Sequence, residues 1–231
     1  MSHSAEIQVM SSAAFKAAYL ELVPGFEHAT GHKVATRWIP GVDLMKRVGE
    51  GETSDLVIMQ AGDIDELINA GRIVAGSRVD LARSGVGVAV RAGAARPDIG
   101  SSEALKRALL AAKSVAHSTG PSGVYIIKLF ERLGIAAELK AKTRQVKGEP
   151  VGALVARGEV EIGFQQVSEL LPVPGIDFLG PLPDDIQQIT IFAAGLQKSA
   201  PQPDAAQALV KFITAPAAAA AIRKSGMEPA A

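Results

Sequence analysis

Residues 55–59 read DLVIM, a run of strand length that is apolar at every position after Asp55. Because both faces of such a strand are apolar, the run predicts a strand covered on both sides, as in a parallel sheet. Outward from it, the same patterns predict strands at 7–10 and 34–38 and helices between Ser12 and Gly31 and at 42–48. The N-terminal part of the chain therefore predicts β-α-β-α-β and an α/β fold class.

The alternation returns at residues 85–90, which read GVGVAV and predict another strand. The elements predicted beyond it are helices at 102–111, 122–133, 151–156, 204–214 and 217–225 and strands at 114–116, 162–164 and 189–194. No repeat, low-complexity tract or flexible linker divides the chain. If there are two lobes, we expect them to share strands rather than a tether.

Composition excludes several classes of protein. The 231 residues carry 24 Lys and Arg against 24 Asp and Glu, so no overall field favours nucleic acid. The absence of cysteine excludes disulfides and thiolate chemistry, and no apolar run approaches the ~18 residues that predict a membrane span. The first residues lack a basic region followed by an apolar one, so we expect either a cytoplasmic protein or a periplasmic one whose signal peptide has been removed.

The segment 117–125, HSTGPSGVY, is the richest candidate for a binding site. It follows a predicted strand and opens a predicted helix, where free N–H groups, hydroxyls and the helix dipole favour an anion. The candidate ligand-binding residues in it are Ser118, Thr119, Gly120, Ser122 and Gly123. His117 and Tyr125 could move a proton. The plain alternative is an ordinary turn with Tyr125 packed in the core.

Three further groups are candidates for ligand binding. They are Ser11 with Ser12 at a strand end, Arg83 with Ser84 before residues 85–90, and the paired amides of Gln165 and Gln166. Each has a plain alternative, which is helix capping for Ser12, surface ion pairing for the arginine and the tying of a loop for the glutamines.

Motifs for cofactors and metals are absent. The four histidines are scattered, no HExxH motif or EF-hand loop occurs, and the glycines fit neither a phosphate-binding P-loop nor a dinucleotide fingerprint. We therefore expect no metal and no cofactor.

The order and spacing of segments over nearly the whole chain resemble the periplasmic molybdate-binding protein family. The segments that carry this resemblance are EIQVMSSAAFKAAYLELVPGFEHATGHKV, GEGETSDLVIM, HSTGPSGVY and ARGEVEIGFQQVSEL. The resemblance implies the type 2 periplasmic-binding-protein fold, with two lobes of mostly parallel sheet, helices on both faces and crossing hinge strands. It implies that lobe 1 comprises 1–84 and 195–231, that lobe 2 comprises 85–194, and that an anion is held in the cleft between them.

At three positions the family has a hydroxyl donor and this chain has none. Ala14, the pair Gly41 and Val42, and Gln166 fall at these positions. Each hydrogen bond lost to a charged ligand typically costs about 1.5–3 kcal/mol. An organic carboxylate is therefore expected in preference to molybdate.

Three segments are similar to a branch of the family that includes bacterial aconitate isomerase. They are DLVIM, GVGVAV and EIGFQQVSELLPVPGID, at 55–59, 85–90 and 161–177. This resemblance implies a tricarboxylate ligand and cis/trans isomerisation by an allylic proton shift. His117 would be the base, with Tyr125 as the other possible proton carrier, and Arg83 with the 118–123 turn would hold carboxylates.

Two other functions stay open beside an isomerase. One is a non-catalytic binding component of an ABC importer for molybdate, a related oxyanion or an organic acid, and the other is a cytoplasmic ligand sensor. The balanced surface charge and a single ligand site favour a monomer.

Overall fold

The computed structural model describes residues 4–230, so the first three residues, which bear on the expectation about a signal peptide, lie outside it. Two compact units are present, unit 1 comprising Met1–Ser84 with Ile191–Ala231 and unit 2 comprising Gly85–Thr190. The chain passes between them inside two strands, β4 (Val79–Arg91) and β9 (Ile189–Leu196). The sequence had placed the second passage after residue 194.

The elements of each unit follow the predicted alternation closely. Unit 1 contains β1 (Glu6–Ser11), η1 (Ala13–Phe15), α1 (Lys16–Thr30), β2 (Lys33–Trp38), α2 (Gly41–Gly49), β3 (Leu56–Gln60), α3 (Ala61–Asn69), α9 (Pro203–Ile213), η3 (Pro216–Ala218), α10 (Ala219–Lys224) and β10 (Glu228–Pro229). Unit 2 contains α4 (Ser102–Ala111), β5 (Val115–Ser118), α5 (Pro121–Arg132), α6 (Ala136–Leu139), β6 (Thr143–Val146), α7 (Val151–Ala156), β7 (Ile162–Gln166), α8 (Val167–Leu170), β8 (Ile176–Pro181) and η2 (Asp184–Ile186). The elements that were not predicted from the sequence are α3, α6, α8, β6, β8 and β10.

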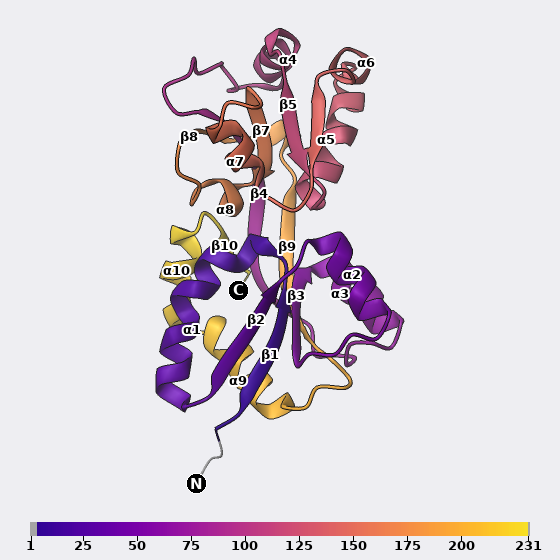
Figure 1. Ribbon diagram of the computed structural model, residues 1–231, viewed down its shortest axis with the longest axis vertical. Helices are drawn as coiled ribbons and strands as arrows, with labels where there is room; N and C mark the ends of the chain where they lie inside the picture. The colour runs from indigo at the N-terminus through magenta and orange to yellow at the C-terminus, as the bar shows by residue number, and fades with distance from the viewer. Residues whose placement is uncertain (1–3, 231) are drawn as a thin grey trace. The chain divides into compact units, whose positions relative to one another are not determined.

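The sheet of unit 1 has the strand order β2-β1-β3-β9. β1 runs parallel to β2 and β3, while β9 is antiparallel to β3, and β10 pairs with the first part of β4. Helices α1, α9 and α10 cover one face and α2 and α3 the other (Figure 1). Phe15, Tyr19 and Phe192 are buried on the first face and Leu44 and Ile64 on the second. Burial of each such side chain contributes about 1.5–3 kcal/mol.

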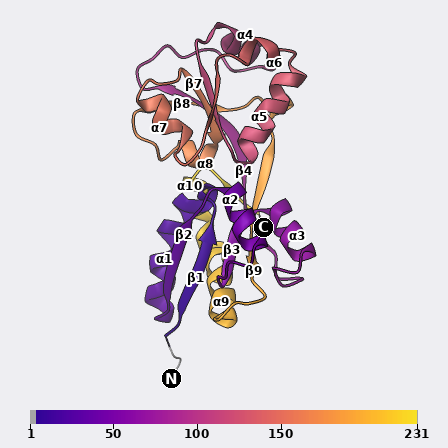
Figure 2. The ribbon, with the colours of Figure 1, turned by 45° about the vertical axis from the view of Figure 1, so that its right-hand side comes forward.

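The sheet of unit 2 has the order β4-β7-β5-β6, with β8 also paired to β4. β5 lies parallel to β6 and β7, and His117 is opposite Phe164 in the register. Helix α5 covers one face and α7 the other (Figure 2). Helix α7 approaches closely because β7 carries Gly163, where a Cβ would lie 2.6 Å from Val155 Cγ2.

Asp55, the first residue of the DLVIM run, lies just before β3 and serves as a buried anchor. Its Oδ2 accepts the N–H of Gln8 at 2.7 Å, and its Oδ1 accepts the N–H of Gln202 at 2.6 Å. The carboxylate therefore joins β1 to the segment that precedes α9.

Within residues 4–230, no single helix has the length and hydropathy of a membrane span. Helix α9 and the segment Pro216–Lys224 have the length and hydropathy of a span only when taken together, and the chain bends by 57° between the two.

Candidate functional site

The turn between β5 and α5 brings Ser118 close to Gly120, Ser122 and Gly123. Ser118 ends β5, and its Oγ accepts the N–H of Gly120 at 3.2 Å and lies 3.2 Å from Ser122 Oγ. Pro121 is the first residue of α5, where its missing N–H costs no helical hydrogen bond. The N–H groups of the first turn have no partner within a helix, so the turn presents donors suited to an anion.

Gly123 allows this turn to be unusually tight. A Cβ at this position would lie 1.7 Å from the carbonyl oxygen of Ser118 and 2.9 Å from Nδ1 of His117. No side chain can be accommodated at such distances, so glycine is required for the first turn of α5 to lie against the end of β5.

His117 is 3% exposed, and its Nδ1 lies 2.8 Å from the carbonyl oxygen of Ser118. A carbonyl oxygen can only accept, so Nδ1 carries a proton and the neutral ring has its lone pair on Nε2. Burial lowers the pKa of His117 below its ordinary value, although the bond to Ser118 opposes this shift. No group in residues 4–230 hydrogen-bonds to Nε2. The ring is therefore neutral near pH 7 and able to accept a proton.

Tyr125 lies two positions beyond the 118–123 turn in α5 and is buried within unit 2. Its hydroxyl donates to the carbonyl oxygen of Ile186 and accepts from Arg132 at 3.0 Å. The Arg132 guanidinium also lies 5.8 Å from the centre of the ring. The hydroxyl proton of Tyr125 is thus held by Ile186, whereas the Nε2 lone pair of His117 has no hydrogen-bond partner in the described chain.

Gln165 and Gln166 are both buried at the end of β7, but successive strand residues point to opposite faces of a sheet. Gln165 accepts the N–H of Val151 at 2.9 Å and donates to Oε1 of Glu169 at 2.9 Å. Gln166 donates to Thr190 at 3.2 Å. The two amides therefore have separate surroundings and do not form one paired donor set.

Glu169 was not singled out in the sequence. It lies in the four-residue helix α8, and burial raises its pKa to about 7 even though the hydrogen bond from Gln165 opposes the shift. The adjacent Ser168 is 2% exposed, and its hydroxyl has no partner within the described chain. Only the spacing of four residues between Gln165 and Glu169 could have pointed to this carboxyl group, since its burial depends on the fold.

In unit 1, Ser11 and Ser12 end β1. The hydroxyl of Ser11 donates to the carbonyl oxygen of Ser12 at 2.9 Å. Ser12 precedes η1, but its side chain makes no capping hydrogen bond, and its buried hydroxyl has no partner in the described residues. The capping alternative is therefore wrong for Ser12.

Arg83 and Ser84 lie in the part of β4 that belongs to unit 1. The backbone of Arg83 is opposite Glu228 of β10, and its exposed side chain forms no ion pair within residues 4–230. The ion-pairing alternative therefore does not describe Arg83. Ser84 is 1% exposed.

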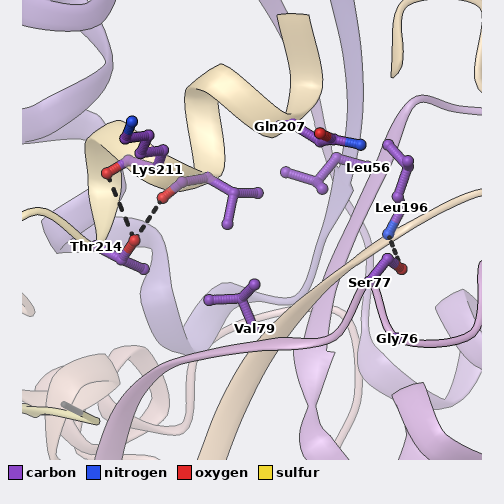
Figure 3. A pocket seen from close by; sticks show the side chains of 9 residues that line it. Leu56, Gly76, Ser77, Val79, Leu196, Gln207, Lys211 and Thr214 are labelled. Atoms are coloured by element: carbon purple, nitrogen blue, oxygen red, sulfur yellow. Dashed lines mark hydrogen bonds between the residues drawn. The ribbon is translucent and has the colours of Figure 1, made fainter. Parts of the chain in front are cut away.

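Unit 1 also contains a cavity of about 350 Å³ beside α9 (Figure 3). Its walls are mainly apolar, and Thr214 at one side donates to the carbonyl oxygen of Val210 at 2.8 Å. The lining residues are Leu56, Gly76, Ser77, Val79, Leu196, Gln207, Val210, Lys211 and Thr214. None of the predicted site residues is among them.

These features define an α/β protein with donor groups for an anion at strand ends, which is the architecture of a solute-binding protein. The family of bacterial extracellular solute-binding proteins matches residues 7–228, and the chain belongs to that family. The α/β fold class and the family resemblance predicted from the sequence are thereby confirmed.

Individual relatives are similar over nearly the whole chain. An aconitate isomerase from Pseudomonas sp. is 39% identical over 229 residues, which cover 96% of this chain and 87% of that protein. The molybdate-binding protein ModA of Azotobacter vinelandii is 30% identical, with coverages of 96% and 90%. In fold, the chain is similar to the solved Azotobacter vinelandii periplasmic molybdate-binding protein, with a TM-score of 0.80 at 19% identity over 96% of this chain and 98% of that one.

Proposed function

We propose that the protein is an enzyme that binds a tricarboxylate and interconverts cis- and trans-aconitate by an allylic proton shift. The observation that carries the proposal is the buried His117 ring, which has its Nδ1 proton directed to Ser118 and its Nε2 lone pair unpartnered in the described chain. The similarity to an aconitate isomerase supports the choice of reaction.

The reaction needs one base and one acid. A base removes a proton from the methylene carbon, and the electron pair of that C–H bond delocalises over the neighbouring double bond and carboxylate. A proton then adds to the former alkene carbon, the double bond moves by one position, and the overall number of protons is unchanged. His117 is the proposed base because its ring is neutral, whereas the hydroxyl proton of Tyr125 is held by Ile186.

Hydrogen-bond donors hold the substrate's carboxylates and stabilise the charge that develops on them. In unit 2 the proposed donors are the N–H groups and hydroxyls of the turn, which are supplied by Ser118, Thr119, Gly120, Ser122 and Gly123. In unit 1 the proposed groups are the unpartnered hydroxyl of Ser12, with Ser11 beside it, and the unpaired guanidinium of Arg83 with Ser84. Gln165 and Gln166, at the end of β7, are the further residues proposed to orient the ligand.

Turnover of cis-aconitate by the His117→Ala and His117→Gln variants tests this function. General acid–base groups typically contribute 10²–10⁴-fold, so we expect kcat to fall at least 100-fold while the ligand still binds. Proton NMR follows both isomers directly. The matched control is His28→Ala, which removes an exposed imidazole of α1 and should leave the rate unchanged. If His117→Ala turned over cis-aconitate at the wild-type rate, His117 would not be the base.

A second candidate is a non-catalytic periplasmic binding component of an importer for an anion. Membership of an extracellular solute-binding family and the 30% identity to ModA favour it. Tight binding of an anion by the wild-type protein, with no turnover of either aconitate isomer, would select this function instead.

A further inference from the structure

The cavity beside α9 in unit 1 has an apolar floor that the proposed chemistry does not use. Leu56, Leu196 and Val210, which are all buried, supply this floor from β3, β9 and α9. Val79, the first residue of β4, also lines the cavity but is exposed, so a small molecule can reach the cavity from solvent. Ligand sites typically enclose about 300–1,000 Å³ and are mostly apolar. At about 350 Å³, the cavity has the size and character of such a site.

The polar side chains that could bind a ligand here lie along α9. Gln207 and Lys211 are four residues apart, so they are neighbours on the surface of the helix. Both side chains are exposed, and neither has a hydrogen-bond or ion-pair partner within residues 4–230. In Figure 3, Lys211 and Thr214 lie on one side of the cavity and Ser77 and Leu196 on the other. The rim on α9 therefore offers an ammonium group and an amide as donors.

The two hydroxyls that line the cavity are already committed to the protein. Ser77 donates to a backbone carbonyl at 2.7 Å and accepts a backbone N–H at 3.1 Å. Thr214 donates its one hydroxyl proton to backbone carbonyls of α9, the nearer at 2.8 Å. No aspartate or glutamate is among the described residues that line the cavity. Its one charged group is therefore positive, and this charge favours an anionic ligand.

We propose that this cavity is a second binding site, which takes an amphipathic organic anion, namely a monocarboxylate with an apolar body. The body contacts the apolar floor, and the carboxylate accepts hydrogen bonds from Gln207 and from Lys211, whose flexible stem lets the ammonium group reach over the rim. A water molecule takes up about 30 Å³ in the liquid, so the cavity has room for about a dozen non-hydrogen atoms. A tricarboxylate has no apolar body, so this ligand differs from the substrate proposed above.

Isothermal titration calorimetry of the full chain with octanoate tests this site. We expect saturable binding of one octanoate, which an excess of citrate or trans-aconitate does not displace. Lys211→Glu should weaken octanoate binding at least about fivefold, because it places a like charge beside the carboxylate, and should leave the affinity for octan-1-ol within about twofold. The matched control is Lys128→Glu, which reverses the charge of an exposed lysine of α5 in unit 2 and should bind octanoate as the wild type does.

Val79→Trp tests the apolar part of the site. The larger side chain enters the cavity from an exposed position, so the buried core does not have to rearrange. We expect octanoate binding to be lost, with the urea midpoint of unfolding unchanged. Unaltered octanoate binding by both Val79→Trp and Lys211→Glu, displacement of octanoate by citrate, or no octanoate binding by the wild type would overturn the proposal. The assay involves no turnover, so its outcome is independent of the proposed isomerase activity.

Discussion

At the scale of single residues, Gly123 imposes the strictest steric condition in unit 2. In Gly123→Ala the added Cβ would meet the Ser118 carbonyl at 1.7 Å, so β5 and α5 must separate. We expect the free energy of unfolding to fall by about 1–3 kcal/mol, as for other overpacked sites, and turnover to be lost because the His117–Ser118 bond is displaced. Urea denaturation and the isomerase assay measure the two effects.

Gly62→Ala is the control for this substitution. Gly62 lies in α3, with no atom within 4 Å of an added Cβ and no positive φ. The replacement should be neutral or stabilise the protein by about 0.5–1 kcal/mol, because alanine is the better helix former. Equal stability losses at both glycines would contradict the steric argument.

Residue-level predictability differs between the two parts of the candidate site. The compact 118–123 turn was predictable, because its glycines, hydroxyls and Pro121 act through local backbone geometry. The separation of Gln165 from Gln166 also follows from the alternation of side chains along any strand. Glu169 could not be identified, because an ordinary glutamate becomes unusual only when α8 is packed against distant elements.

At the scale of elements, Asp55 anchors β1 and the segment before α9 through two backbone N–H groups. Asp55→Ala leaves both donors without their acceptor. Each hydrogen bond to a charged group typically contributes about 1.5–3 kcal/mol, so we expect a loss of about 3–5 kcal/mol in the free energy of unfolding. Asp55→Asn keeps one acceptor oxygen and should lose about half as much.

Chemical denaturation followed by circular dichroism checks this expectation. The control is Asp185→Ala, since Asp185 is exposed and its side chain has no partner in the described chain. If Asp55→Ala unfolded at the same urea concentration as the wild type, the two short contacts of Asp55 would not be stabilising the fold.

The elements that were predicted have strong local signals. The apolar runs of β1 and β3 and the glycine stop of α1 at Gly31, where φ is 76°, are properties of neighbouring residues. β6 and β8 were missed because their residues are only partly buried and lack a clear period. Asp55 was assigned to a strand, although its side chain binds two segments that are remote in sequence.

At the scale of the whole molecule, ligand preference should separate the two candidate functions. We expect citrate and the two aconitate isomers to raise the melting temperature, and molybdate, tungstate and sulfate to have little effect. A ligand at 100 times its Kd stabilises the folded protein by about 2.7 kcal/mol. Differential scanning fluorimetry across this panel provides the comparison, and stabilisation by molybdate alone would reverse the preference.

The chain crosses between the units twice, so the two units are completed at different points of synthesis. Unit 2 is encoded by one uninterrupted stretch, Gly85–Thr190, whereas unit 1 needs Ile191–Ala231 to complete its sheet and to cover it with α9 and α10. Domains fold as units during synthesis. Unit 1 is therefore begun first and completed last. In a nascent chain that stops at Thr190, the apolar surface of β1 and β3 that Phe192 and Leu209 later cover is still exposed.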